Sequence, residues 1–424
     1  MGGGPLGSGI ATFAAMFGGQ GNATTVNYGT VKGEVTTASG LAGTGTGNAT
    51  LINYGTIDTT SARATGGGLV DTASFGKAAY VFNAGKIIGE VGAFGTSGGS
   101  VIFSNAGIID GSYSGIAINL TQAVPFSNAA DPTVPTTLNI LHGSRILGSV
   151  LLNGIAGAPG SNPTTINIFG GRDISSVLSF GAFTGGCACG PPTYVGGLIN
   201  TGAKVNIFGG VPYVISGNSV ALLDPTSFAA QDRNVLDFTR TVLSAASSRL
   251  TSPVPISGDG SAAIGFAPSG NVARDMANDA FANIPALSDA GQDRVLRSNP
   301  NFTAADGTSV WAQGFGGVRV QNADGPNLRS VNQFYGGILG FDKMVRPDMR
   351  LGGFAGGGTV TSQIDMNSGR TNSDMGFGGI YGRYAMNKAF LDFALLAGGS
   401  SNNVKRTMTN NLAAGGYEYA NANY

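Results

Sequence analysis

Short β-branched runs alternate with Asn-x-Gly or Gly-Gly turns through the first half of the chain. The string GNATTVNYGTV at 21–31 returns as GNATLINYGTI at 47–57, with eight of eleven positions identical. Weaker copies begin at Val81, Ile102, Leu138, Ile166 and Val205. Each copy predicts a strand, a turn and a second short strand, such as 30–35 or 86–91.

The copies align on one asparagine each, and the intervals between these asparagines vary. The aligned residues are Asn27, Asn53, Asn83, Asn105, Asn139, Asn167 and Asn206. One copy cannot bury its apolar side chains alone, whereas stacked copies share a continuous core and can form asparagine ladders. The pattern therefore predicts a parallel β-solenoid (β-helix); a β-sandwich with Gly-rich hairpins is the alternative.

A helical period replaces this pattern after Gly217. Apolar residues spaced three, four or seven apart predict one buried face of a helix at 226–250. They are Phe228, Val235, Phe238, Val242, Ala246 and Leu250. Four charged residues cluster in the first half of this helix: Asp232, Arg233, Asp237 and Arg240. From this segment alone, a solvated face explains them. The following stretch, to 306, is rich in Pro, Ser and Gly and is predicted to be a linker with a short helix around 272–282.

Long alternating segments separated by strong turn residues begin after Thr308. In the fifth of them, Leu391, Phe393, Leu395 and Ala397 share one face, and Asp392 lies on the other. The fourth likewise sets Ile380, Tyr384 and Met386 against Arg383. Apolar residues on one face and lone charges on the other are typical of antiparallel strands in an outer-membrane barrel. A soluble β-sandwich is the alternative interpretation.

Composition and charge support three regions: 1–220, 221–306 and 307–424. The chain of 424 residues contains 72 Gly and only 11% charged side chains, yet 42% of it is hydrophobic, which favours β-structure over disorder. The first 220 residues hold 14 charged side chains and the remainder 32. Because 23 Lys and Arg balance 23 Asp and Glu, no global field draws the chain to nucleic acid.

Candidate chemistry is sparse. His142 is the single histidine, and its place in a repeat copy favours a structural imidazole over a catalytic base. Cys187 and Cys189 are the two cysteines, for which a loop disulfide is favoured over a metal site. The carboxylates of the first 220 residues form no local pair; they are Asp58, Asp71, Asp110, Asp131, Asp173, Glu34 and Glu90. No catalytic, cofactor-binding or metal site is predicted.

The order of segments along the chain resembles that of a classical autotransporter, the type V secretion system. A Gly-, Thr- and Asn-rich solenoid comes first, followed by the helical segment DPTSFAAQDRNVLDFTRTVLSAASSRL and a linker. The strand segments VWAQGFGGVRVQNADGP and FGGIYGRYAMNKAFLDFALLAGGSSNN follow. The resemblance implies a C-terminal twelve-stranded outer-membrane barrel, a pore helix at 226–250 and a surface-displayed passenger. It also implies that Asp232, Arg233, Asp237 and Arg240 face a polar pore wall, with Arg383 and Asp392 as candidate contacts.

Three features depart from that family. A signal peptide is not recognisable, and the chain offers five or six barrel segments, so we expect it to be truncated at both ends. Asn234 is followed by Val235 and not by a second asparagine, so self-cleavage in the helix is not expected.

The expected function is that of an autotransporter fragment with no enzymatic activity. The barrel would anchor in the bacterial outer membrane and export a solenoid stalk or adhesin to the cell surface. The expected partners are outer-membrane lipid, the barrel-assembly machinery and a surface ligand, with no nucleic acid and no cofactor. A secreted solenoid enzyme acting on glycans and a soluble fibre-like structural protein are the alternatives.

Overall fold

The computed structural model describes residues 10–13, 21–39, 47–60, 69–74, 77–95, 98–120, 134–152, 164–182, 203–251, 301–304, 306–386 and 389–424. The linker after Thr251, the short helix expected around 272–282, and the Cys187 and Cys189 pair lie outside these ranges. The chain divides into two compact units, Met1–Asp224 with Thr407–Tyr419, and Pro225–Arg406 with Ala420–Tyr424.

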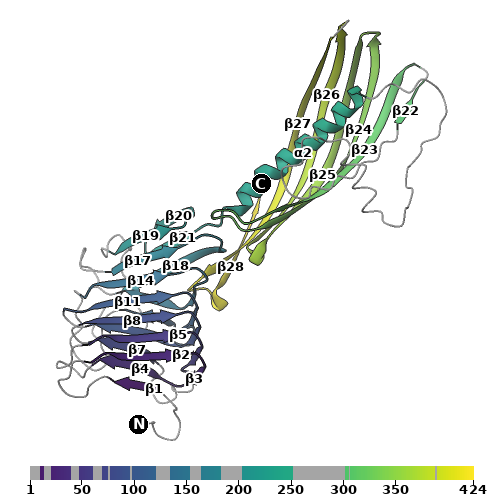
Figure 1. Cartoon of the computed structure of the whole chain (residues 1–424). Coiled ribbons are helices and arrows are strands. Elements are labelled where there is room, and N and C mark those ends of the chain that lie inside the picture. Colours follow the sequence, from purple (N-terminus) through teal and green to yellow (C-terminus); the bar gives the residue numbers. More distant parts are fainter. Residues whose placement is uncertain are drawn as a thin grey trace. The chain divides into compact units, whose positions relative to one another are not determined.

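The first unit is a solenoid of three parallel sheets, stacked coil upon coil (Figure 1). The first sheet contains β1 (Ile10–Phe13), β4 (Val35–Ser39), β7 (Leu69–Ser74), β10 (Glu90–Gly95), β13 (Ile116–Asn119), β16 (Ser149–Leu152) and β18 (Ser175–Ala182). The second contains β2 (Ala23–Asn27), β5 (Ala49–Asn53), β8 (Ala78–Asn83), β11 (Ser100–Asn105), β14 (Thr136–Ile140), β17 (Thr164–Phe169) and β19 (Lys204–Phe208). The third contains β3 (Thr30–Lys32), β6 (Thr56–Asp58), β9 (Lys86–Ile88), β12 (Ile108–Asp110) and β15 (Arg145–Leu147).

Glycine corners explain why each coil has three strands and not the two expected. Gly33 and Gly89 have positive φ angles of 123° and 138°. They interrupt the runs 30–35 and 86–91, so that one strand joins the third sheet and the next joins the first sheet. Only glycine adopts this backbone conformation readily.

Apolar columns fill the solenoid. In the second sheet, Leu51, Val81, Phe103, Leu138 and Ile166 stand in register on successive coils. All of them are at most 2% exposed. The third sheet contributes Ile57, Ile87, Ile109 and Ile146, and the first contributes Val35, Val70, Val91, Ile118, Val150 and Phe180. The repeat therefore supplies each coil with apolar residues that are buried only by its neighbours.

An asparagine ladder runs along the turn between the second and third sheets. Asn27 donates from Nδ2 to Oδ1 of Asn53 at 2.8 Å, and the same bond joins Asn53 to Asn83 and Asn83 to Asn105. Each donor amide also reaches backbone carbonyls, so the buried side chains are well satisfied. The glycine of each turn permits this stacking, because a Cβ on Gly55 would lie 2.0 Å from the carbonyl oxygen of Gly29.

The expected ladder of seven asparagines is wrong at one point. Asn139 pairs in register with Ser104, one residue before Asn105, and Asn105 bonds instead to Ser144. A slip of one residue sends a strand's side chain to the opposite face. Asn139, Asn167 and Asn206 therefore form a second, half-buried ladder with 2.8 Å bonds between successive amides.

Two antiparallel strands follow the parallel coils. β20 (Tyr213–Ser216) and β21 (Ser219–Leu222) form a hairpin, and β21 pairs antiparallel with β18. Gly217, with a φ of 58°, lies in the turn between them.

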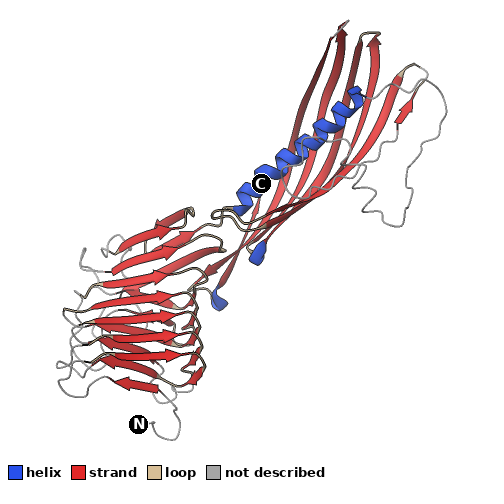
Figure 2. Cartoon of the chain, in the orientation of Figure 1, coloured by secondary structure: helices blue, strands red, loops and turns tan. Residues whose placement is uncertain are grey.

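The second unit combines one long helix with antiparallel strands (Figure 2). The helix is α2 (Thr226–Thr251), and it contacts β24, β25 and β26. The strands are β22 (Asn301–Thr303), β23 (Thr308–Gln321), β24 (Ser330–Arg346), β25 (Met349–Ile364), β26 (Gly369–Met386), β27 (Ala389–Asn410) and β28 (Tyr417–Asn423). The end of β27 and the start of β28 lie within Thr407–Tyr419, which belongs to the first unit. Short 3-10 turns, Asp365–Asn367 and Ala414–Gly416, join two of the strand pairs. The all-β fold class with a linker helix is confirmed.

Alternation gives this antiparallel sheet two different faces. One face meets the helix, and the other carries exposed apolar side chains, including Tyr335, Leu339 and Phe341 on β24. On β27, the side chains of Leu391, Phe393 and Leu395 are likewise exposed, as their spacing predicts. Such a face is typical of strands that contact lipid.

Candidate functional site

Helix α2 lies against the sheet through a buried stripe that differs from the predicted one. Phe238, Val242, Ala246 and Leu250 are buried as expected. Phe228 and Val235 are not: they are 54% and 45% exposed. The helical stripe passes instead through Ala230, Asn234, Asp237 and Ala245, all of which are buried.

Aromatic rings form the surface on which the helix rests. Phe238 packs edge-on between Phe315 and Phe377, with ring centroids 5.2 and 5.3 Å apart. Glycines on neighbouring strands make room for such rings, since a Cβ on Gly340 would lie 2.4 Å from the Trp311 ring and one on Gly352 2.6 Å from that of Tyr381. Glycines such as Gly340 and Gly352 thus leave room for the large rings of this region.

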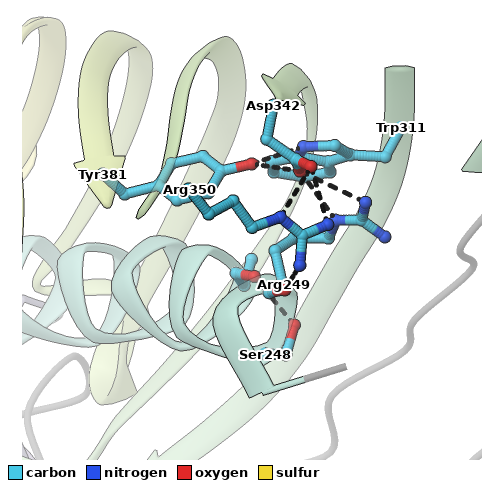
Figure 3. A network of polar contacts seen from close by, with 7 residues as sticks. Ser248, Arg249, Trp311, Asp342, Arg350 and Tyr381 are labelled. Atoms are coloured by element: carbon cyan, nitrogen blue, oxygen red, sulfur yellow. Dashed lines mark hydrogen bonds and ion pairs between the residues drawn. The ribbon is translucent and has the colours of Figure 1, made fainter. Parts of the chain in front are cut away.

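The C-terminal end of the helix is bound by a buried polar cluster centred on Asp342 (Figure 3). The Asp342 carboxylate is 1% exposed and receives hydrogen bonds from Arg350 Nε at 2.9 Å, from Arg249 Nη2 at 3.2 Å and from the Tyr381 hydroxyl at 2.8 Å. Trp311 Nε1 donates in turn to the Tyr381 oxygen at 2.8 Å. Because the buried charge is both paired and hydrogen-bonded, its desolvation is compensated.

Arg350 also binds the helix backbone directly. Its Nη1 donates to the carbonyl oxygen of Arg249 at 2.8 Å. The last four carbonyls of a helix lack intrahelical partners, and a cation beside them is favourable for the helix dipole. One strand residue therefore joins the Asp342 carboxylate to the end of α2.

The middle and the start of the helix are bound separately. Asp237 Oδ1 lies 2.8 Å from Arg319 Nη2, and both residues are more than nine-tenths buried. At the start, the Leu328 N–H donates to the Thr226 hydroxyl at 2.7 Å. Arg406 stacks on the Phe228 ring and bonds to Ser227. The helix is thus held along its length.

The six residues predicted from sequence are placed in three ways. Asp237 faces the sheet and pairs with Arg319. Asp232, Arg233 and Arg240 are exposed on the helix. Arg383 and Asp392 bond to each other across β26 and β27 at 2.6 Å. They do so on the face of the sheet that carries Tyr381.

Sequence reasoning missed the residues that bind the helix: Arg249, Asp342, Arg350 and Tyr381 of the cluster, and Arg319, the partner of Asp237. Each is a lone polar or aromatic residue in a glycine-rich strand or at a helix end. The parity of the strand was the usable signal, because Asp342 alternates with the exposed Phe341 and Lys343.

The solenoid brings carboxylates together that are far apart in sequence and form no local pair there. Asp71 lies in register with Thr36 and Gly92, and Glu34 and Glu90 each lie two residues before these positions. Burial and the two glutamates raise the pKa of Asp71 to about 7. Its Oδ1 has no hydrogen-bond partner among the described residues. His142 pairs with Asp173 at 3.5 Å, on the surface.

Among the residues that the structure describes, no group of three His, Cys, Asp or Glu residues is arranged to hold a metal ion. No described helix is both long and apolar enough to cross a membrane.

Comparison with known proteins gives one match. Residues 310–424 match a family model described as the autotransporter beta-domain. Neither the curated proteins nor the solved structures include a match to the chain.

Proposed function

Because residues 310–424 make this chain a classical autotransporter with its translocator domain at the C-terminus, we propose that its solenoid is a non-enzymatic passenger, a stalk or an adhesin. The β-domain is an outer-membrane barrel that anchors the chain, serves translocation and displays the passenger on the cell surface. What we propose is the role of the passenger itself, as a non-enzymatic stalk or adhesin.

The seating of α2 is the single observation that carries the proposal. The helix follows the solenoid directly in sequence and is held against the β-domain sheet by Asp342, Arg319 and Arg350. The chain runs from the solenoid into this helix, so fixing the helix keeps the passenger attached to the β-domain. The helix also fills space on the inward face of the barrel wall. The proposal assigns α2 the role of the tether that remains in the lumen after export.

The outward face of the sheet supports lipid as a partner. Exposed large apolar side chains lie on β23, β24, β26 and β27. They include Val310, Tyr335, Leu339, Phe341, Ile380, Tyr384, Leu391, Phe393 and Leu395. The proposed partners are outer-membrane lipid, the barrel-assembly machinery and a surface ligand of the passenger. Zero net charge gives no support for nucleic acid.

Exposed aromatic and hydroxyl groups on the solenoid support adhesion. Tyr28 and Tyr54 stack at 5.2 Å and are 76% and 49% exposed. Rings with a polar hydroxyl are favoured in binding surfaces because they combine apolar contact with hydrogen bonding. A stalk or adhesin binds through such a surface without a catalytic group.

Surface labelling tests the proposal. Intact cells producing the chain are treated with antibody to the solenoid and then with protease. We expect the solenoid to be labelled and released, while the β-domain stays in the membrane fraction and migrates differently before and after heating. Labelling of the solenoid only after the outer membrane is permeabilised would contradict surface display.

A glycan-acting solenoid is the second candidate, and Asp71 is the observation that favours it. Burial and two further carboxylates raise the pKa of Asp71 to about 7, so the group is partly protonated at neutral pH, and a general acid must be protonated to act. Release of reducing ends from a panel of polysaccharides, abolished by Asp71→Asn, would favour this candidate. Release that Asp71→Asn leaves unchanged, or no release at all, would reject it.

A further inference from the structure

A segment of the β-domain folds as part of the solenoid unit. Thr407–Tyr419 lies inside the residues that match the β-domain model, yet it groups with Met1–Asp224 in the compact solenoid unit. The segment comprises the last residues of β27, the Ala414–Gly416 turn and the start of β28.

The end of β27 supplies a strand that the solenoid itself lacks. β18 pairs with β16 only in its second half, from Phe180 onward. In its first half, Ser175, Ser176 and Val177 pair in parallel with Met408, Thr409 and Asn410. The β27 end therefore continues the parallel sheet along the edge of β18 that β16 leaves unpaired among the described residues.

Asn411 bridges the coil of β16 and the coil of β18, whose strands are not paired with each other before Phe180. It is 2% exposed, and its Nδ2 donates to the carbonyl oxygens of Ser179 at 2.9 Å and Gly148 at 3.1 Å. Its Oδ1 accepts the Ser179 N–H at 2.8 Å, and its own carbonyl accepts the Gly148 N–H at 2.6 Å. A single asparagine thus satisfies both backbone groups of Gly148 and both of Ser179.

The turn that follows makes a second contact on the same coil. Arg145 Nη2 donates to the Gly415 carbonyl oxygen at 2.9 Å, and its guanidinium lies 4.3 Å from the centre of the Tyr417 ring. Gly416 fits against Leu147, where a Cβ would lie 3.0 Å from the leucine side chain. Backbone, polar and packing contacts all join this segment to the coil formed by Arg145–Leu152.

We propose that Thr407–Tyr419 is an internal docking segment for the passenger. It inserts beside β18, bridges the last coils through Asn411 and provides the base on which this end of the solenoid is stable. The inference rests on the proposed function, in which the solenoid is the passenger of this β-domain. An edge strand with unpaired backbone groups readily accepts another strand, which is the physical basis of the docking.

A cysteine pair tests the contact. Ser176 and Thr409 are partners in register, and Cα atoms of paired neighbouring strands lie within the range that a disulfide spans. In full-length protein with Cys187 and Cys189 changed to serine, Ser176→Cys with Thr409→Cys should crosslink on the surface of intact cells. The matched control, Ser176→Cys with Asn403→Cys, should not. Equal crosslinking of the two pairs would overturn the docking.

Asn411→Ala tests the stability that docking provides. We expect protease to digest the solenoid of this variant on intact cells about tenfold faster than the wild-type solenoid, because three backbone groups, the Ser179 N–H and the carbonyls of Ser179 and Gly148, lose their partner. The control is Asn402→Ala, a buried asparagine of the same strand in the other unit. Equal digestion rates for Asn411→Ala and the wild type would overturn the proposal.

Antibody labelling of the same cells separates the two proposals. If the parent chain is not labelled, surface display itself fails, and the docking inference fails with it. If the parent is labelled and heat-modifiable but neither crosslinks at Ser176 and Thr409 nor depends on Asn411, only the docking inference fails. If Asn411→Ala does not reach the cell surface, Arg145→Ala is tested in its place. We again expect faster digestion of the solenoid than in the wild type, and digestion at the wild-type rate would contradict the docking.

Discussion

The solenoid and the β-domain both bury polar side chains, but they satisfy them by opposite means. The solenoid stacks identical residues, because register places Asn27, Asn53, Asn83 and Asn105 above one another. The β-domain brings together residues of opposite charge from different elements, as at Asp342 with Arg249 and Arg350. An amide both donates and accepts, so it can pair with its own copy, whereas a carboxylate cannot.

Asp71 shows how a charged side chain behaves when it lies among the stacked coils of the solenoid. Burial of the Asp71 carboxyl raises its pKa, and the like charges of Glu90 and Glu34 on neighbouring coils raise it further. At Asp342, by contrast, two guanidinium groups and a phenol converge on one carboxylate. Repetition therefore restricts the solenoid interior to self-complementary groups, and the antiparallel sheet with its helix is free of that restriction.

Removing the central carboxylate of the β-domain should have the largest effect. Asp342→Asn leaves Arg249 and Arg350 largely buried without a counter-charge, and we expect a loss of about 3–5 kcal/mol in the free energy of unfolding. Urea titration of the full chain in detergent, followed by fluorescence, measures it. The control, Asp365→Asn, breaks an exposed pair with Arg329 and should change stability by less than about 1 kcal/mol.

Breaking the buried asparagine ladder should come next. Asn83→Ala leaves Asn53 without its acceptor and Asn105 without its donor, at a cost of about 2 kcal/mol. Far-UV circular dichroism during urea titration follows the solenoid. Asn167→Ala, in the half-buried second ladder, should cost clearly less, since water can replace the lost partners there. Equal costs would show that burial does not distinguish the two ladders.

Filling a glycine position beside an aromatic ring should have a smaller effect on the β-domain. Gly340→Ala forces the Trp311 ring to shift, and we expect a loss of about 1–2 kcal/mol together with a changed emission spectrum. Gly376→Ala adds a Cβ that meets nothing within 4 Å and is the matched control. A neutral Gly340→Ala would show that the ring has room to move.

A pH-dependent effect is expected from Asp71, the carboxylate that the solenoid places near Glu34 and Glu90. The folded-state pKa of Asp71, about 7, lies above its ordinary value of 3.8, so the folded state holds more protons between those values. Wild-type stability should therefore fall as pH rises from about 4 to about 7 and level off above that. Asp71→Asn should remove this fall, so the variant should be more stable than the wild type at pH 8. Thermal melts at several pH values measure it, and a wild-type stability that rises across this window would contradict the assignment.

The sequence predicted the periodic features well, because periodicity is visible in one dimension. The helix expected at 226–250 is observed as Thr226–Thr251, and Leu391, Phe393 and Leu395 share the exposed face. The ladder register after Asn105 failed because a single-residue slip leaves the motif unchanged in sequence while reversing the face of Asn139.

The residues that hold the helix against the sheet were harder to predict from the sequence, for a different reason. Asp342, Arg350 and Arg249 come from two strands and a helix, and only the packed fold brings them within hydrogen-bonding distance. The apolar stripe was misjudged at Phe228 and Val235 because Asn234 and Asp237 take the buried positions, and Asp237 is buried with its partner Arg319. Pairing across elements leaves no local signal in the sequence.

A double-mutant cycle between the helix and the sheet tests the central claim most directly. Trp311 is the single tryptophan of the chain, and its Nε1 bonds to Tyr381 within the Asp342 cluster, so its fluorescence reports on this site alone. Unfolding of the wild type, Arg249→Met, Asp342→Asn and the double variant gives the coupling energy. We predict a coupling of about 1.5 kcal/mol or more between the two positions. A coupling of less than about 0.5 kcal/mol, with the two single effects simply adding, would contradict the claim that Asp342 holds the helix against the β-domain.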